Sequence, residues 1–207
     1  MRQPSRPRLG AEVTLLEAGS RVGQKILASG SGWCNLTHTG VAPDAYDAPE
    51  FVAPVLAECG CQDVLAFFGD LGLLTCADDE GRVYPVTNAA NSVLDVLRLE
   101  CVHLGVVERF EFQVALPGHT LSLDTPALAH FRLPVTGTGY AAPEQVTRGG
   151  AQLAGFDPAT IASRVAPGVF AAGEVLDVDG RCGGFNLHCA WASGIAADKS
   201  AVRQGGL

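Results

Sequence analysis

Residues 168–187 constrain the fold of this chain more than any other stretch, because they combine an apolar segment, an Ala-Gly-Glu turn and a second pair of glycines. The apolar residues 169–172 predict a short buried strand, and a helix is predicted from about Gly184 to Val202. Small residues between a strand and a helix let a ligand approach the backbone closely, and the free N–H groups of a first helical turn attract negative charge. A tight turn with nothing bound fits the pattern equally well.

The residue order decides between these readings. The runs FAAGEVLDVDG at 170–180 and GGFNL at 183–187 resemble the C-terminal FAD motif of the BaiN/YhiN-like flavoproteins, which are NAD(P)/FAD-dependent, aminoacetone-oxidase-like oxidoreductases. The resemblance implies that the Ala-Gly-Glu turn closes on the flavin. It also implies that the following helix directs its N-terminus toward the cofactor.

Near the N-terminus, the apolar run 11–16 ends in Glu17 and predicts a buried parallel strand. An acid at the end of the second strand of a dinucleotide-binding unit binds ribose hydroxyls, so Glu17 is a candidate FAD ligand. A solvated glutamate at a strand end is the alternative. The Gly-x-Gly-x-x-Gly loop expected before such an acid is missing, since the only glycine ahead of Glu17 is Gly10.

Residues 23–38 resemble a second signature of the same family, in which a basic run leads into Ser-Gly-Gly-Gly-Arg-Cys-Asn-Leu-Thr. The glycines and serines at 29–32 predict a nest of backbone N–H groups that can face phosphate or flavin oxygens, and Lys25 can add positive charge. Trp33 stands where the family has arginine, which removes a guanidinium but could pack on an aromatic ring. A glycine-rich surface loop is the alternative.

Two nearby side chains allow both functional and structural interpretations. Cys34 could react with a flavin, but it lacks a Cys-x-x-Cys partner and is better explained as a small packing residue. His38 could donate a proton, although a single loop histidine is more often only hydrogen-bonded.

The middle of the chain alternates between helical and extended patterns. Apolar residues at three- and four-residue steps predict helices over 49–72, with stops at Gly60 and Gly72. Two short strands, at 73–76 and 82–84, should flank a turn, and a further helix is predicted from about 93 to 104.

Composition limits the partners and the cellular compartment. The chain has 207 residues, 47% of them hydrophobic, and a net charge of -8, which argues against nucleic acid and anionic membranes as partners. The seven cysteines show no zinc-like pairing, so we expect reduced thiols, a cytoplasmic protein and no metal site.

The predicted fold is α/β, an incomplete Rossmann-like FAD-binding domain with a mostly parallel sheet flanked by helices. The resemblance covers two segments, 10–107 and 133–207, joined by a short remnant at 108–132 in place of a large inserted domain. The chain thus resembles a truncated and internally deleted family member, organised as a single domain over 1–207. Strands 12–17 and 169–172 should be near neighbours.

The resemblance implies an FAD-dependent oxidoreductase with NAD(P)H as electron donor. The alternative is a non-catalytic remnant that binds FAD weakly or not at all, and an exposed flavin cleft could also make it form a homodimer. No residue is predicted as a catalytic acid or base, and the substrate and the choice of NADH or NADPH stay open. The candidate cofactor-binding residues are Glu17, Lys25, Gly30, Gly32, Cys34, Asn35, Gly173, Glu174, Asp177, Gly184, Asn186 and Leu187.

Overall fold

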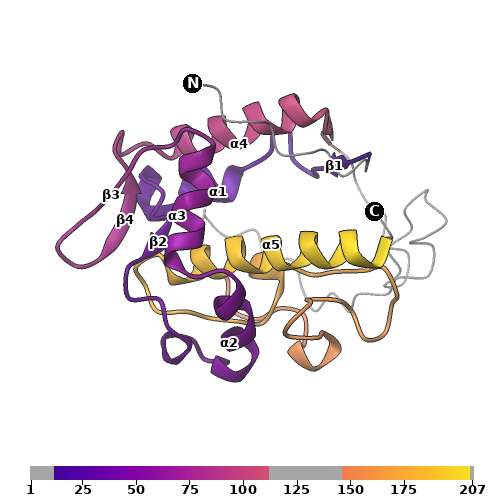
Figure 1. Cartoon of the computed structure of the whole chain (residues 1–207). Coiled ribbons are helices and arrows are strands. Elements are labelled where there is room, and N and C mark those ends of the chain that lie inside the picture. Colours follow the sequence, from indigo (N-terminus) through magenta and orange to yellow (C-terminus); the bar gives the residue numbers. More distant parts are fainter. Residues whose placement is uncertain (1–11, 112–145, 206–207) are drawn as a thin grey trace.

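The computed structural model describes residues 12–111 and 146–205 and shows an α/β arrangement in which helices surround two small sheets (Figure 1). Its helices are α1 (Gln24–Ala28), α2 (Pro49–Glu58), α3 (Cys61–Asp70), α4 (Ala90–Leu104) and α5 (Phe185–Gly205). Its strands are β1 (Thr14–Leu16), β2 (Thr37–His38), β3 (Thr75–Ala77), β4 (Arg82–Pro85) and β5 (Val107–Arg109). Short 3-10 turns occur at η1 (Ser29–Gly32), η2 (Pro43–Ala45), η5 (Leu153–Gly155) and η6 (Gly173–Val175).

The helical pattern between 49 and 72 is confirmed, with its break at Gly60. Helix α2 begins with a proline, whose fixed φ suits the first turn. The Gly60 N–H donates to Asp63 Oδ2 at 2.8 Å, which fixes the start of α3. Val64 and Phe68 on one face of α3 are fully buried. The break at Gly60 changes the direction of the chain, so that two short helices pack against one core.

The five strands form one parallel pair and one antiparallel sheet. β1 pairs with β5 in parallel, with Thr14 opposite Val107. The second sheet has the order β2-β4-β3 and is antiparallel throughout, and its β3–β4 hairpin confirms the predicted strand pair. The structure therefore has the predicted parallel element flanked by helices, together with a hairpin sheet.

Two expectations about individual strands are wrong. The strand at the N-terminus was expected to be buried, but Leu15 is 37% exposed and Leu16 is 41% exposed. Residues 169–172 form no strand: Phe170 makes only an isolated antiparallel bridge with Ala162. β1 pairs with β5 and not with this segment. Local sequence predicts which segments can extend, but it does not specify the partner that a strand needs.

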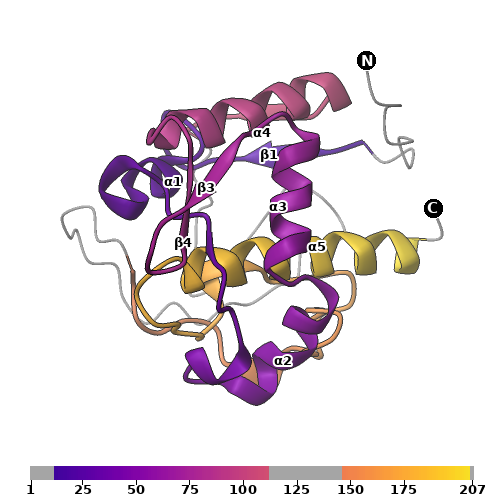
Figure 2. The same ribbon diagram turned by 60° about the vertical axis from the view of Figure 1, so that its left-hand side comes forward.

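Helix α5 is the central element of the core. In both views it runs between α4 on one side and α2 on the other, and the second view shows α3 spanning from α4 to α5 (Figures 1 and 2). The Trp191 indole packs edge-on against the Phe68 ring, with 5.2 Å between the ring centroids. Its Nε1–H donates to the Leu36 carbonyl at 3.2 Å. These contacts attach α5 to α3 and to the segment that precedes β2.

Within the described residues, no single helix is long and apolar enough to cross a membrane. The bent pair α2–α3, which turns by 45°, meets that test only when its two helices are combined. The expectations for Gly10, for the segment 112–132 and for the renewed resemblance at 133–145 concern residues outside the described part of the chain.

Candidate functional site

A cavity of about 780 Å³ lies where the two glycine-rich motifs meet. This volume is within the range of small-molecule sites. The motif at 23–38 contributes one wall, and the motif at 173–191 contributes another. Eight of the predicted cofactor residues line it: Lys25, Gly30, Asn35, Gly173, Glu174, Gly184, Asn186 and Leu187.

The first wall contains a left-handed turn. Gly30, Ser31 and Gly32 have consecutive φ values of 55°, 57° and 89°, which place them in the left-handed region, and Gly30 and Ser31 line the cavity. A nest of N–H groups alternates right- and left-handed residues, so this segment forms a left-handed turn in place of the predicted nest. Glycine is required at Gly30, because a Cβ there would lie 2.8 Å from the Asn35 nitrogen.

The second wall contains the start of α5. Gly184 has a φ of 97°, and a Cβ at this position would lie 2.5 Å from Asn35 Oδ1 and 2.6 Å from the Thr37 carbonyl oxygen. Only glycine therefore lets the helix approach the first motif so closely. The first turn of this 21-residue helix lines the cavity, together with residues 189–191 of the next turn, so the positive end of the helix dipole lies close to the cavity.

Lys25 and Glu174 join the two walls. Lys25 Nζ lies 3.0 Å from Glu174 Oε2, and the Thr147 N–H donates to Glu174 Oε1 at 2.9 Å. The predicted phosphate ligand and the predicted flavin ligand are therefore paired with each other. Both side chains are partly exposed, at 47% and 37%, so the pair can exchange for another partner at small cost.

The second motif is held in shape by hydrogen bonds from α5. Asn186 Oδ1 accepts from the Gly180 N–H at 2.6 Å, and Asn186 Nδ2 donates to the Gly180 carbonyl at 3.1 Å. The Gly173 N–H donates to the buried Ser193 hydroxyl at 2.9 Å. Asn186 was predicted as a cofactor ligand, and both ends of its amide are used by the protein backbone.

Four predicted residues lie outside the lining of this cavity: Glu17, Gly32, Cys34 and Asp177. Glu17 accepts the Gly19 N–H at 2.7 Å at the end of β1. Cys34 is fully buried, and burial raises the pKa of its thiol to about 11. The structure therefore favours the packing interpretation of Cys34 over a reactive one.

The two histidines beside the cavity differ in environment. His38 lines the cavity and stacks on Phe185, with 4.6 Å between the ring centroids. Its Nδ1 accepts a hydrogen bond from the Gly40 N–H at 2.9 Å. Since Nδ1 is an acceptor, the neutral ring carries its hydrogen on Nε2. Nε2 of such a ring can donate a hydrogen bond.

His188 was not singled out by sequence reasoning. It is fully buried on α5, and burial lowers its pKa to about 4. Nε2 lies 3.2 Å from the Cys59 carbonyl, which can only accept, so Nδ1 accepts from the Thr37 hydroxyl at 2.7 Å. This neutral ring ties α5 to α2 and β2.

Other lining residues were also missed, including Arg82, Tyr84, Asp179 and Trp191. Arg82 and Tyr84 come from β4, Asp179 from the loop before α5, and Trp191 from α5, and only the tertiary fold brings them together at the cavity. Trp33 packs edge-on to Tyr84 at 6.0 Å, which confirms that the indole packs on an aromatic ring. Within the described part of the chain, no group of three or more His, Cys, Asp or Glu side chains could hold a metal ion.

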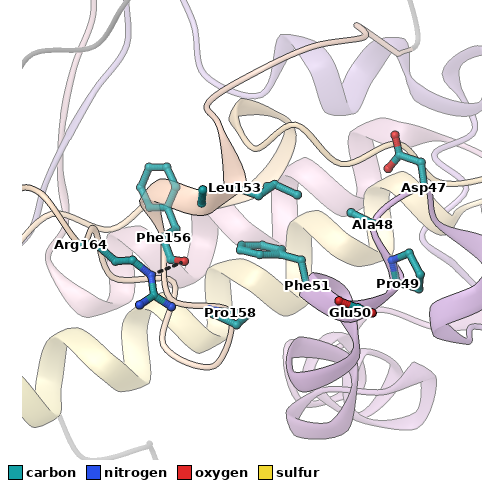
Figure 3. A pocket seen from close by; sticks show the side chains of 10 residues that line it. Asp47, Ala48, Pro49, Glu50, Phe51, Leu153, Phe156, Pro158 and Arg164 are labelled. Carbon is teal, nitrogen blue, oxygen red and sulfur yellow. Dashed lines mark hydrogen bonds between the residues drawn. The ribbon is translucent and has the colours of Figure 1, made fainter.

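A second cavity, of about 760 Å³, lies between the start of α2 and the segment 153–164 (Figure 3). Phe51, Leu153 and Phe156 form its apolar centre. Arg164 lies at one end, where its Nε donates to the Phe156 carbonyl at 3.1 Å. No predicted cofactor residue lines this cavity.

Comparison with known proteins agrees with the motifs. The HI0933-like protein Rossmann domain matches residues 5–125 and 120–200. The chain is 41% identical over 92 residues to a 3-dehydro-bile acid delta(4,6)-reductase of Clostridium scindens, covering 44% of this chain and 22% of that protein. It is also similar to two ribosomal RNA dihydrouridine synthases. For that of Haemophilus influenzae the identity is 31%, over 47% of this chain and 25% of that protein. For that of Escherichia coli it is 30%, over 65% of this chain and 35% of that protein.

The matches thus span from 22% to 35% of the length of these relatives. The family model, by contrast, covers most of the present chain. The predicted Rossmann-like class is therefore confirmed, and the chain belongs to the HI0933-like family.

Proposed function

We propose that this chain forms the flavin site of an FAD-dependent oxidoreductase that takes electrons from NAD(P)H. The observation that supports it most is the meeting of two motifs, far apart in the sequence, on one cavity. One supplies a left-handed turn at Gly30 and Ser31, and the other supplies the start of a long helix. The N–H groups at the start of a helix bind anionic oxygens.

The described residues fit such a cofactor. Gly30 and Gly184 line the cavity and let the two motifs that enclose it approach closely, and the amide oxygen of Asn35 is buried without a hydrogen-bond partner in the described part of the chain. The backbone N–H groups of residues 29–32 and Lys25 would hold oxygens of the pyrophosphate, and the first turn of α5 would hold the ring carbonyls. When bound, the flavin supplies hydride transfer, and the protein orients it.

The names of the three relatives describe one reductase and two dihydrouridine synthases. Both kinds of name favour the reducing direction for the present site. Because the net charge is -8, we retain the prediction that nucleic acid is not a partner of this chain, and the substrate stays open.

One observation favours the alternative, in which the chain binds FAD weakly and does not turn over. Glu17, the predicted ribose ligand, lies outside the cavity and bonds to the neighbouring Gly19 N–H instead. A lost hydrogen bond to a charged acceptor weakens binding by roughly 1.5–3 kcal/mol.

The oxidoreductase and the non-catalytic alternative differ in whether bound flavin accepts electrons from a nicotinamide nucleotide. FAD-loaded chain would be mixed anaerobically with NADH or NADPH while the visible flavin absorption is followed. Bleaching by one of the nucleotides supports an oxidoreductase and identifies its donor. Bound flavin that reacts with neither nucleotide would contradict the proposed donor, and a chain that retains no flavin would leave the non-catalytic alternative.

A further inference from the structure

We propose that the second cavity, between the start of α2 and residues 153–164, binds a flat apolar carboxylate, with the carboxylate on Arg164 and the ring system against Phe51 and Phe156 (Figure 3). This cavity shares no lining residue with the one between the two glycine-rich motifs. The inference goes beyond the proposed function, because it concerns a different ligand at a different place in the fold.

The first argument is the size and the lining of the cavity. Its volume of about 760 Å³ is within the range of small-molecule sites. Phe51, Leu153 and Phe156 form its apolar centre, and Pro158 also lines it. A ring system packed on aromatic side chains gains more than the burial of its area alone provides. The lining therefore favours a ligand with a flat apolar body.

The second argument is the position of Arg164. Its Nε donates to the Phe156 carbonyl at 3.1 Å, which holds the guanidinium at one end of the apolar centre (Figure 3). Its backbone N–H donates to the Gly155 carbonyl at 2.8 Å. Both the main chain and the side chain of Arg164 are thus fixed to this loop, so the guanidinium loses little freedom when a ligand binds.

The third argument is the binding capacity that this guanidinium retains. One terminal nitrogen, Nη2, lies 3.5 Å from Asp157 Oδ2, and the Arg164 side chain is 55% exposed. Such a long and exposed ion pair is weak. The other terminal nitrogen, Nη1, makes no hydrogen bond within the described part of the chain. A guanidinium binds a carboxylate through two parallel N–H donors, which Arg164 can direct to a ligand.

The loop that carries these residues has a fixed shape. Phe156 and Ser163 form an antiparallel bridge across it. Asp157 Oδ1 accepts the N–H groups of Ala159 and Thr160, each at 3.0 Å. The side chain of Ile161, which lies between them and Arg164 in the sequence, is fully buried. The wall of the cavity is therefore preorganised and does not have to be ordered by the ligand.

The opposite end of the cavity carries negative charge. Asp47 and Glu50 line it, and Figure 3 shows Asp47 far from Arg164. Asp47 Oδ1 accepts the Asp179 N–H at 2.8 Å, which fixes this carboxylate. Because like charges repel, an anionic group is disfavoured at this end. The ligand should therefore bind in one orientation, with its carboxylate toward Arg164.

The test compares two probes that share one ring system and differ in charge, 2-naphthoate and its neutral amide, 2-naphthamide. Dissociation constants would be measured by naphthalene fluorescence for the native chain and for Arg164→Gln. We expect the native chain to bind naphthoate about tenfold more tightly than naphthamide at low salt, and Arg164→Gln to reduce this ratio to less than about threefold.

Arg203→Gln, in the exposed last turn of α5, is the matched control, because it removes the same charge far along the chain and should keep the native ratio. If Arg164→Gln does not fold, as judged by its thermal transition, Ala154→Glu replaces it. Ala154 is an exposed lining residue, and a carboxylate there should also reduce the ratio to less than about threefold.

Three results would overturn the inference. Equal binding of the two probes to the native chain would exclude a carboxylate ligand. A native ratio in a folded Arg164→Gln or Ala154→Glu variant would exclude this cavity. Displacement of naphthoate by FAD would place the probe in the cavity of the two glycine-rich motifs.

Discussion

Lys25 Nζ lies 3.0 Å from Glu174 Oε2, and this ion pair connects the two glycine-rich motifs that line the 780 Å³ cavity. The residue expected to attract the pyrophosphate is thus neutralised by the acid of the Ala-Gly-Glu turn. A ligand phosphate that binds here must compete with Glu174 for Lys25.

Removing the competing charge should therefore strengthen binding. We expect Glu174→Gln to tighten FAD binding by about three- to tenfold at low salt, with a smaller gain at high salt. Isothermal titration at two ionic strengths would measure it. Glu58→Gln, which breaks the remote pair with Lys199 (3.4 Å), is the control, and an equal gain in both variants would show that only net charge matters.

Gly184 should be intolerant of any side chain. Gly184→Ala adds a Cβ close to Asn35 Oδ1 and the Thr37 carbonyl at a φ of 97°, so we expect a loss of about 1–3 kcal/mol in the free energy of unfolding. Urea unfolding would measure it. Gly194→Ala, inside α5 with nothing within 4 Å of the new atom, should gain up to about 1 kcal/mol. Similar losses in both variants would contradict the close approach described here.

His188 predicts a dependence of stability on acid pH. Its folded pKa is lowered from 6.5 to about 4, so the unfolded chain binds a proton first as the pH falls. The stability conferred by the neutral ring is present above pH 6.5 and is lost as the pH falls toward 4, by about 3 kcal/mol in total.

Urea unfolding at neutral pH and near the lower pKa, for the native chain and His188→Gln, would isolate this contribution. The native chain should lose more stability than the variant between the two conditions. Equal losses would show that other groups control the acid sensitivity.

Helix positions were largely predictable from the sequence, because periodicity and glycine stops are local signals. The break at Gly60 and the left-handed Gly72 after α3 illustrate this. The β3–β4 pair, which a short turn connects, was predictable, but partners far apart in the sequence were not. The apolar run 169–172 satisfied the strand pattern, but in the structure only Phe170 bridges to Ala162.

The site residues also divide into those that local sequence predicts and those that depend on the tertiary fold. The motifs identified the residues that approach the cavity, yet pairings such as Asn186 with the Gly180 backbone depend on how the chain folds back on itself. Glu17 is predicted as a ribose ligand from its place at the end of a strand, which is a local signal. In the structure its carboxylate accepts the Gly19 N–H, a contact that the strand pattern does not specify.

The cysteines should separate into two reactivity classes. Cys34 and Cys189 are buried, and burial raises their pKa values to about 11 and about 12. Cys76 and Cys182 are exposed. Under native conditions a thiol reagent should label the exposed pair first, as followed by peptide mass analysis. Early labelling of Cys34 would contradict its role as a packing residue.

The central claim, that the two motifs build a flavin site, is tested most directly by the visible spectrum of the purified chain after incubation with FAD and removal of free ligand. The account predicts retained flavin bands for the native chain and for Gly194→Ala. It predicts markedly weaker bands for a folded Lys25→Met variant, because loss of the ammonium removes a charge-assisted contact worth about tenfold in affinity. A native chain that is folded, as shown by a cooperative thermal transition, yet colourless after this treatment would contradict the claim.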